Sequence, residues 1–112
     1  MSDYLDKWEV TWLSDAVVST IEVPMWYFYV LQSLQNPDYF YKGSTDDLRL
    51  RLQQHNNKET DSIRPYLPFR LVYYEAYLSE RTARKREASV KHSGSVSIPL
   101  LRRIKENIEE IR

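Results

Sequence analysis

The sequence predicts a small α+β domain in which a three-stranded antiparallel sheet is flanked by helices. Segments rich in aromatic and β-branched residues alternate with segments of helix-forming residues, and turn signals separate the two kinds. A length of 112 residues suits one compact domain with a modest core. The expected order of elements is strand, strand, helix, strand, helix, helix.

Three segments have the composition of strands. Residues 26–33 are crowded with aromatic and β-branched side chains and are apolar on both faces, which is typical of a central strand covered on two sides. Residues 36–38, Asn-Pro-Asp, provide turn chemistry before a short second strand at 39–43, so the pair predicts a hairpin. Residues 69–78 carry the strongest strand signal in the chain.

The first helix is predicted over residues 48–56. Its leucines alternate as in a strand, but its Leu, Arg and Gln composition favours a helix. Ser44, Thr45 and Asp46 offer helix N-caps, and this decides for the helix. Residues 57–68 are polar, contain two prolines and predict a loop.

Two further helices are predicted in the C-terminal third. Ser79 is placed to cap a helix over residues 80–91, which residues 93–95, Ser-Gly-Ser, would end. Ser97, with Pro99 just inside, then starts the last helix. Its apolar residues repeat at spacings of three and four and are expected to face the core: Leu101, Ile104, Ile108 and Ile111.

The formal net charge of zero conceals two unlike segments. Residues 1–24 hold one basic and five acidic residues, a net of −4, whereas residues 25–112 hold 15 basic and 11 acidic residues, a net of +4. We expect residues 1–24 to form an acidic N-terminal extension, which either lies outside the fold or packs on it through its apolar side chains. The basic body is compatible with a phosphate-bearing partner.

Several classes of protein are excluded or disfavoured. The absence of cysteine excludes disulfide scaffolds, thiolate zinc sites and cysteine nucleophiles. The longest apolar run, residues 25–31, is far short of the ~20 residues that cross a bilayer, and no signal peptide is evident, so we expect a cytoplasmic protein without a membrane partner. His55 and His92 do not form a zinc-binding His pair, and glycine-rich phosphate loops are absent.

A different set of residues carries a family resemblance. Residues 27–29, Tyr-Phe-Tyr, are followed after 11 residues by 41–43, Tyr-Lys-Gly. Arg51 stands eight residues after this second motif, His55 one helical turn later, and Glu87 ends a basic Arg-Lys-Arg-Glu run. This pattern resembles the GIY-YIG endonuclease family, in particular its small stand-alone members, which are similar to the incision domain of the bacterial excision-repair nuclease.

The resemblance implies a metal-dependent DNA endonuclease that hydrolyses phosphodiester bonds with Mg²⁺ or Mn²⁺. Glu87 would hold the metal, since hard cations prefer oxygen ligands. Arg51 would clamp a phosphate with its planar guanidinium, and His55 would project from the same helix face at spacing i, i+4. Tyr29 and Tyr41 would line the site, and which of them acts as general base stays open.

Taken singly, each of these residues is typical of an ordinary strand or surface position, and only their joint spacing favours a site. The expected partner is DNA, recognised by structure rather than by base sequence. One alternative is a nucleic-acid-binding module of the same fold without catalytic activity, and another is a protein-interaction domain. Glu75 is a rival carboxylate for the metal. The basic residues expected to contact nucleic acid are Lys42, Arg49, Arg84 and Lys91.

Overall fold

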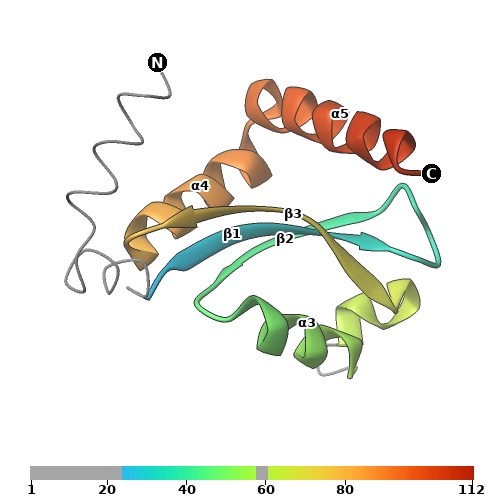
Figure 1. Ribbon diagram of the computed structural model, residues 1–112, viewed down its shortest axis with the longest axis horizontal. Helices are drawn as coiled ribbons and strands as arrows, with labels where there is room; N and C mark the ends of the chain where they lie inside the picture. The colour runs from blue at the N-terminus through green and yellow to red at the C-terminus, as the bar shows by residue number, and fades with distance from the viewer. Residues whose placement is uncertain (1–23, 58–60) are drawn as a thin grey trace, which may run out of the picture.

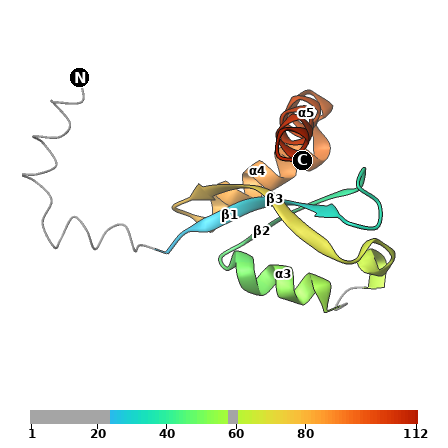
Figure 2. The same ribbon diagram turned by 45° about the vertical axis from the view of Figure 1, so that its right-hand side comes forward.

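A computed structural model of the protein describes residues 24–57 and 61–112, and shows a three-stranded sheet with helices on both faces (Figures 1 and 2). The predicted α+β class and order of elements are confirmed. The acidic extension predicted for residues 1–24 lies outside the described residues, except for its last residue. The elements are β1 (Trp26–Ser33), β2 (Phe40–Thr45), α3 (Leu48–Asn56), the 3₁₀ helix η2 (Asp61–Tyr66), β3 (Phe69–Tyr77), α4 (Glu80–His92) and α5 (Gly94–Glu110).

The sheet has the order β2-β1-β3, and both pairs are antiparallel. β1 is therefore the central strand, as its two apolar faces predict, and its last six residues are all buried. The pairing of β1 with β3 is interrupted by a bulge. Val30 lies opposite Tyr73 and Leu31 lies opposite Leu71, which leaves Val72 between them without a partner.

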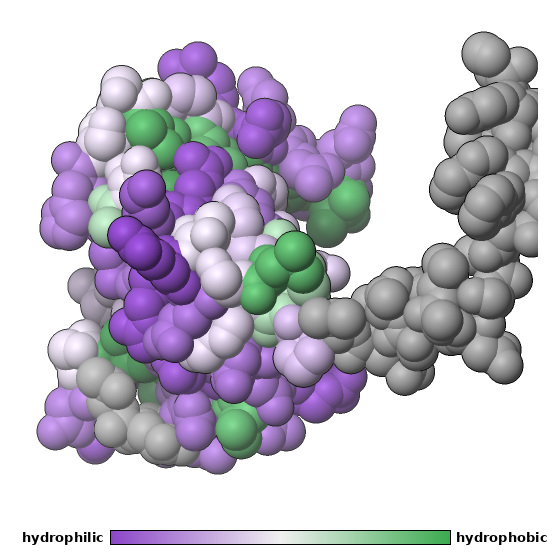
Figure 3. Space-filling model, turned by 90° about the vertical axis from the view of Figure 1, so that its left-hand side faces the viewer, coloured by the Kyte–Doolittle hydropathy of each residue, from purple (hydrophilic) through white to green (hydrophobic). Residues whose placement is uncertain are grey.

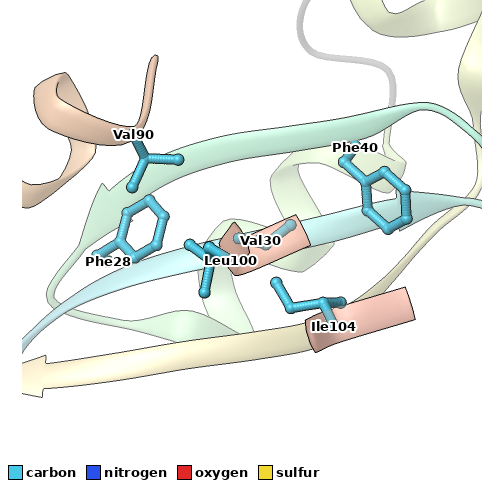
Figure 4. Close-up of a cluster of buried hydrophobic side chains, with 6 residues drawn as sticks. All are labelled: Phe28, Val30, Phe40, Val90, Leu100 and Ile104. Carbon is cyan, nitrogen blue, oxygen red and sulfur yellow. The ribbon is translucent and has the colours of Figure 1, made fainter. Parts of the chain in front are cut away.

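Each face of the sheet has its own hydrophobic core. In Figure 1, α4 and α5 lie above the sheet, and α3 and η2 lie below it. The core under α4 and α5, drawn in Figure 4, consists of Phe28, Val30, Phe40, Val90, Leu100 and Ile104. The core on the α3 side consists of Tyr29, Leu31, Ile63, Leu67 and Phe69. Adjacent residues of β1 thus point into different cores, because side chains of a strand alternate between faces.

Helix α3 has the predicted bounds but not the predicted cap. Asp47 is the N-cap, and its carboxylate accepts a hydrogen bond from the Leu50 backbone N–H at 3.0 Å. Thr45, one of the predicted caps, is instead the buried end of β2, where its hydroxyl accepts from the Asp47 N–H at 3.1 Å. Strand β2 continues two residues further than predicted, and this moves the cap position. The predicted loop 57–68 contains the short helix η2.

The last helix begins earlier than predicted. Ser79 caps α4 as expected, accepting from the Thr82 N–H at 3.2 Å, but α5 starts at Gly94 rather than at Ser97. Ser93 alone, in an extended conformation, ends α4 and begins α5, so Pro99 lies inside α5. One extended residue suffices to redirect the chain, and therefore the Ser-Gly-Ser break is shorter than its composition indicates.

The residues of α5 that were predicted to face the core are only partly correct. Ile104 is buried as predicted, but Ile111 is 72% exposed. Leu100, which was not predicted to face the core, is only 3% exposed. Ile111 lies directly after the last residue of α5 and is its C-cap. Its side chain therefore does not follow the helical periodicity of the core-facing residues. Within the described residues, no helix combines the length and apolar composition that a membrane span needs.

Burial of Leu100 predicts a stability difference within α5. Leu100→Ala should lower the free energy of unfolding by about 2 to 5 kcal/mol, because it removes buried methyl groups and leaves a cavity. Ile111→Ala should change it by no more than about 0.5 kcal/mol, since that side chain is exposed. Urea denaturation of both variants measures the difference, and equal effects would contradict this account of the core.

Candidate active site

Tyr29 lies at the centre of the candidate site. It is 1% exposed on the α3 face of β1, directly opposite Gly43 of β2. A Cβ atom on residue 43 would overlap the hydroxyl and ring of Tyr29. Gly43 is thus required by a close approach, since its φ is not positive and any residue type would accept its backbone conformation. Gly43 of the Tyr-Lys-Gly motif thus leaves space for the ring of Tyr29 from the Tyr-Phe-Tyr motif.

His55 joins both tyrosines from the last turn of α3. Its Nε2 atom lies 3.1 Å from the hydroxyl oxygen of Tyr29, and its ring centroid lies 4.6 Å from that of Tyr41 in an edge-to-face arrangement. The next residue, Asn56, holds this end of α3 to the start of β3. Its side chain donates to the Phe69 carbonyl at 3.1 Å and accepts from the Phe69 N–H at 2.8 Å. The three predicted residues Tyr29, Tyr41 and His55 are therefore in contact.

Burial sets the protonation of the hydrogen-bonded pair. Burial and the neighbouring Tyr41 raise the pKa of Tyr29 to about 12, although Arg51 opposes this shift. Burial, and after it the charge of Arg51, lower the pKa of His55 below its usual value. Near neutral pH the phenol is therefore protonated and the imidazole is neutral. In the tautomer that carries its proton on Nδ1, Tyr29 donates the hydrogen bond and Nε2 accepts it.

Glu87 approaches the same strands from the other side of the sheet. Its carboxylate accepts hydrogen bonds from the Ser44 hydroxyl at 2.5 Å and from the Lys91 ammonium at 2.7 Å. Burial by itself would raise the pKa of Glu87, but the bonds from Lys91 and Ser44 outweigh it and hold that pKa below its usual range. Glu87 also contributes to the raised pKa of Tyr29. The two side chains thus interact electrostatically, although they come from opposite faces of the sheet.

Strand β2 separates the two groups of side chains. Tyr41 and Gly43 face α3, whereas Lys42 and Ser44 pair with Val30 and Phe28 on the α4 face. Sequence reasoning missed Ser44 as a partner of Glu87 and weighed it only as a helix cap. Its position directly after the Tyr-Lys-Gly motif was the available signal.

The rival carboxylate Glu75 has a different environment. It accepts two hydrogen bonds from Arg86, at 2.9 and 3.0 Å, and further bonds from the hydroxyls of Tyr73 and Tyr77. Although burial opposes it, these bonds hold the pKa of Glu75 below its usual range. The network links α4 to β3 and leaves Glu75 saturated with donors. It fixes the helix that carries Glu87 and does not itself resemble a metal site.

The predicted nucleic-acid contacts occupy both sides of the sheet. Arg49 is exposed on α3, and Lys42 is half-buried on β2. On α4, Arg84 pairs with Glu80 at 2.6 Å and Lys91 pairs with Glu87, so both cations have acidic partners within their own helix. Their contact with nucleic acid stays a prediction.

The family is decided by comparison with known proteins. A family model described as the GIY-YIG catalytic domain matches residues 25–95, a range that holds all five predicted site residues. The chain belongs to the GIY-YIG family. This is a nuclease family, and membership implies a nucleic-acid substrate.

Relatives of this GIY-YIG domain include small bacterial proteins. It is 34% identical over 82 residues to a UPF0213 protein of Lactiplantibacillus plantarum, covering 70% of this chain and 79% of the relative. It is 39% identical over 72 residues to a UPF0213 protein of Streptococcus agalactiae, covering 63% and 78%. The solution NMR structure of a UPF0213 protein from Bacillus halodurans matches with 30% identity and a TM-score of 0.39, covering 79% of this chain and 85% of that chain.

The Tyr29–Gly43 contact predicts a large effect for one added methyl group. Gly43→Ala should destabilise the domain by about 1 to 3 kcal/mol, because the methyl group displaces Tyr29 from a packed site. The control is Gly94→Ala, where the new Cβ meets a described atom only at 3.7 Å and the cost should be close to zero. Thermal denaturation compares the two variants. If both unfold like the unmodified domain, the contact does not constrain residue 43.

The lowered pKa of His55 predicts a pH-dependent stability. A histidine in the unfolded chain has a pKa of about 6.5, so the unfolded chain binds more protons than the folded domain as pH falls below that value. The contribution of His55 to the free energy of unfolding is therefore complete above about pH 6.5 and is lost as pH falls through the folded pKa. The free energy of unfolding should therefore decrease below about pH 6.5, by at most about 1.4 kcal/mol per pH unit from this group.

Two histidine variants isolate that effect. His55→Gln should remove the slope that begins below about pH 6.5, whereas His92→Gln should retain it, because His92 is exposed. Urea denaturation across this range supplies the measurement. The same slope in His55→Gln as in the unmodified domain would show that another group causes it.

Proposed function

We propose that this GIY-YIG domain is a metal-dependent DNA endonuclease that hydrolyses phosphodiester bonds. The observation that carries the proposal is the hydrogen bond between Tyr29 and His55, in an environment that both Arg51 and Glu87 influence. Phosphodiester hydrolysis needs a group that takes a proton from water, positive charge for the phosphate and a site for a divalent cation. These residues provide one of each.

The donor set around Glu87 fits Mg²⁺ or Mn²⁺. A carboxylate held ionised, with the Ser44 hydroxyl beside it, offers the oxygen ligands that hard cations prefer. In the described parts of the chain, no three histidine or acidic side chains are grouped closely enough to hold a metal. A cation at Glu87 would therefore take its remaining ligands from water and from the phosphate. When bound, it would supply positive charge to the phosphate oxygens.

Tyr29 and His55 provide a path for the proton of the attacking water. A phenol with a pKa of about 12 is a poor base when it must ionise fully. The water proton can instead move to the Tyr29 oxygen as the phenolic proton moves to the neutral Nε2 atom of His55, 3.1 Å away. Tyrosine then remains uncharged, and the imidazole carries the proton.

Arg51 is suited to bind the phosphate. Its Nε donates to the Gln54 side chain at 3.1 Å, and this bond orients the guanidinium. Among the described residues it forms no ion pair with a carboxylate, so its positive charge is available to an anion beside Tyr29. Arg49 and Lys42 would add contacts along the DNA backbone without selecting a base sequence.

One observation favours the alternative of a binding module without turnover. Lys91 already neutralises Glu87, and a cation must displace that ammonium to reach the carboxylate. If Lys91 stays in place, the domain binds DNA but does not cleave it. The two functions therefore differ in whether a divalent cation reaches Glu87.

Glu87→Gln distinguishes the two functions. It should reduce Mg²⁺-dependent nicking of supercoiled plasmid by at least about 100-fold, because it removes the charge that holds the metal, while DNA binding persists. Glu106→Gln, at an exposed position of α5, is the control and should nick like the unmodified protein. Unmodified protein that binds plasmid yet never nicks it, in Mg²⁺ or Mn²⁺, would support the binding module.

A further inference from the structure

We propose that Tyr27 and Tyr74 form a stacking site for an unpaired nucleobase of the DNA, beside Tyr29. The inference rests on the proposed function and deepens it, since it names the structural feature by which the domain would select its substrate. It rests on a different pair of side chains from those assigned to the reaction. Tyr27 belongs to the first of the paired motifs, but Tyr74 lies outside both, and the arrangement of the sheet brings the two together.

The two rings lie on the same face as Tyr29. Tyr27 precedes it by two residues on β1, so both side chains point toward the α3 side. Tyr74 is the direct cross-strand partner of Tyr29 on β3. The centroids of Tyr27 and Tyr74 are 5.6 Å apart, and their planes meet at 75°. Tyr27 and Tyr74 thus form an aromatic group on the sheet face that also carries Tyr29.

The β3 bulge places Tyr74 on this face. Leu71 belongs to the α3-side core, and Tyr73 packs on the α4 and α5 core, although two residues of a regular strand at this spacing would share a face. The unpaired residue Val72 shifts the alternation by one. Tyr74 consequently faces the same side as Tyr29.

The outer part of the aromatic group is open. The side chain of Tyr74 is 52% exposed, and neither Tyr27 nor Tyr74 belongs to the two hydrophobic cores. Ala76, the cross-strand partner of Tyr27, is exposed and small, so within residues 24–57 and 61–112 it adds little bulk beside the rings. Figure 3 views the end of the molecule where β1 begins and β3 ends. Its surface is mainly hydrophilic with separate hydrophobic spots, which suits a nucleic acid better than an apolar protein face.

A nucleotide matches the chemistry and the spacing of this group. Arg51 lies within electrostatic reach of the Tyr29 hydroxyl and supplies the charge for a phosphate. Tyr74 is one strand away from Tyr29, a distance of about 5 Å between backbones, whereas the Tyr29 ring extends the other way, over Gly43. A DNA strand with one phosphate at Arg51 would therefore cross β1, so that the base of a neighbouring nucleotide lies over Tyr74. Bases inside a duplex are stacked on their neighbours and present no free ring face. The subsite therefore selects DNA that carries unpaired nucleotides, with little preference for their identity.

The test compares two DNA probes under conditions that prevent cleavage. The full chain is titrated, in EDTA, into a fluorescent duplex with a short unpaired segment and into a fully paired duplex of equal length. The unmodified protein should bind the first probe more tightly. Tyr74→Ala should weaken that binding about tenfold and leave duplex binding nearly unchanged, because stacking on one aromatic ring contributes on that scale.

Two variants act as controls. Tyr74→Phe keeps the ring and should bind like the unmodified protein, which separates stacking from hydrogen bonding by the hydroxyl. Leu34, in the connection after β1, is 53% exposed, nearly the same as Tyr74. Leu34→Ala should therefore leave the affinity for both DNA probes unchanged. Tyr27→Ala should reproduce the effect of Tyr74→Ala on the probe with unpaired nucleotides.

Three outcomes would overturn the proposal. The first is equal affinity of the unmodified protein for both probes, and the second is an equal loss of affinity for both probes in Tyr74→Ala. The third is unchanged binding by Tyr74→Ala together with a lowered melting temperature, which would show that the tyrosine pair serves packing within the chain. Failure of the proposed function is recognised separately. In that case Tyr74→Ala still loses affinity for the probe with unpaired nucleotides in EDTA, but the unmodified protein nicks no plasmid in Mg²⁺.

Discussion

The contact between Tyr29 and Gly43 is the constraint on which the candidate site depends. A buried tyrosine ring fits across the neighbouring strand only because that strand has no side chain there. The hydroxyl then reaches His55, and the Asn56 bonds to Phe69 keep the end of α3 beside it. The same burial that packs the ring raises the pKa of Tyr29 and lowers that of His55. Packing and acid–base properties therefore have one origin.

The sheet divides the chemistry between its faces. The tyrosines and the Arg51–His55 helix lie on the α3 side, while Glu87 comes from the α4 side and is fixed by Ser44 and Lys91. The bonds between Glu75 and Arg86 attach α4 to β3. Arg86 directly precedes Glu87, so these bonds hold the part of α4 that carries Glu87. The charge of Glu87 nevertheless acts on Tyr29, on the other face of the sheet. The candidate site therefore draws its residues from helices on opposite faces of the sheet.

Much of the fold could be predicted from local signals. β1 and α3 have the predicted bounds, since aromatic content, helix-forming composition and turn residues are properties of short segments. The cap of α3 and the start of α5 were predicted wrongly, and the burial of Leu100 was missed, because each depends on distant elements, whereas Leu101, Ile104 and Ile108 contribute to the core as predicted. β2 runs on to Thr45 only because it pairs with Tyr27, and Leu100 is buried only because α5 lies over the sheet at that position.

The sequence by itself determined the class of fold, the family and the residues that the family pattern marks, because strand composition and motif spacing are written along the chain. The tertiary structure decided which of these residues meet. It joined Tyr29 to His55 across 26 positions and Ser44 to Glu87 across 43, and through a bulge at Val72 it placed Tyr74 on the same sheet face as Tyr29. These relations follow from strand register and helix docking, where a shift of one residue reverses the face of every side chain.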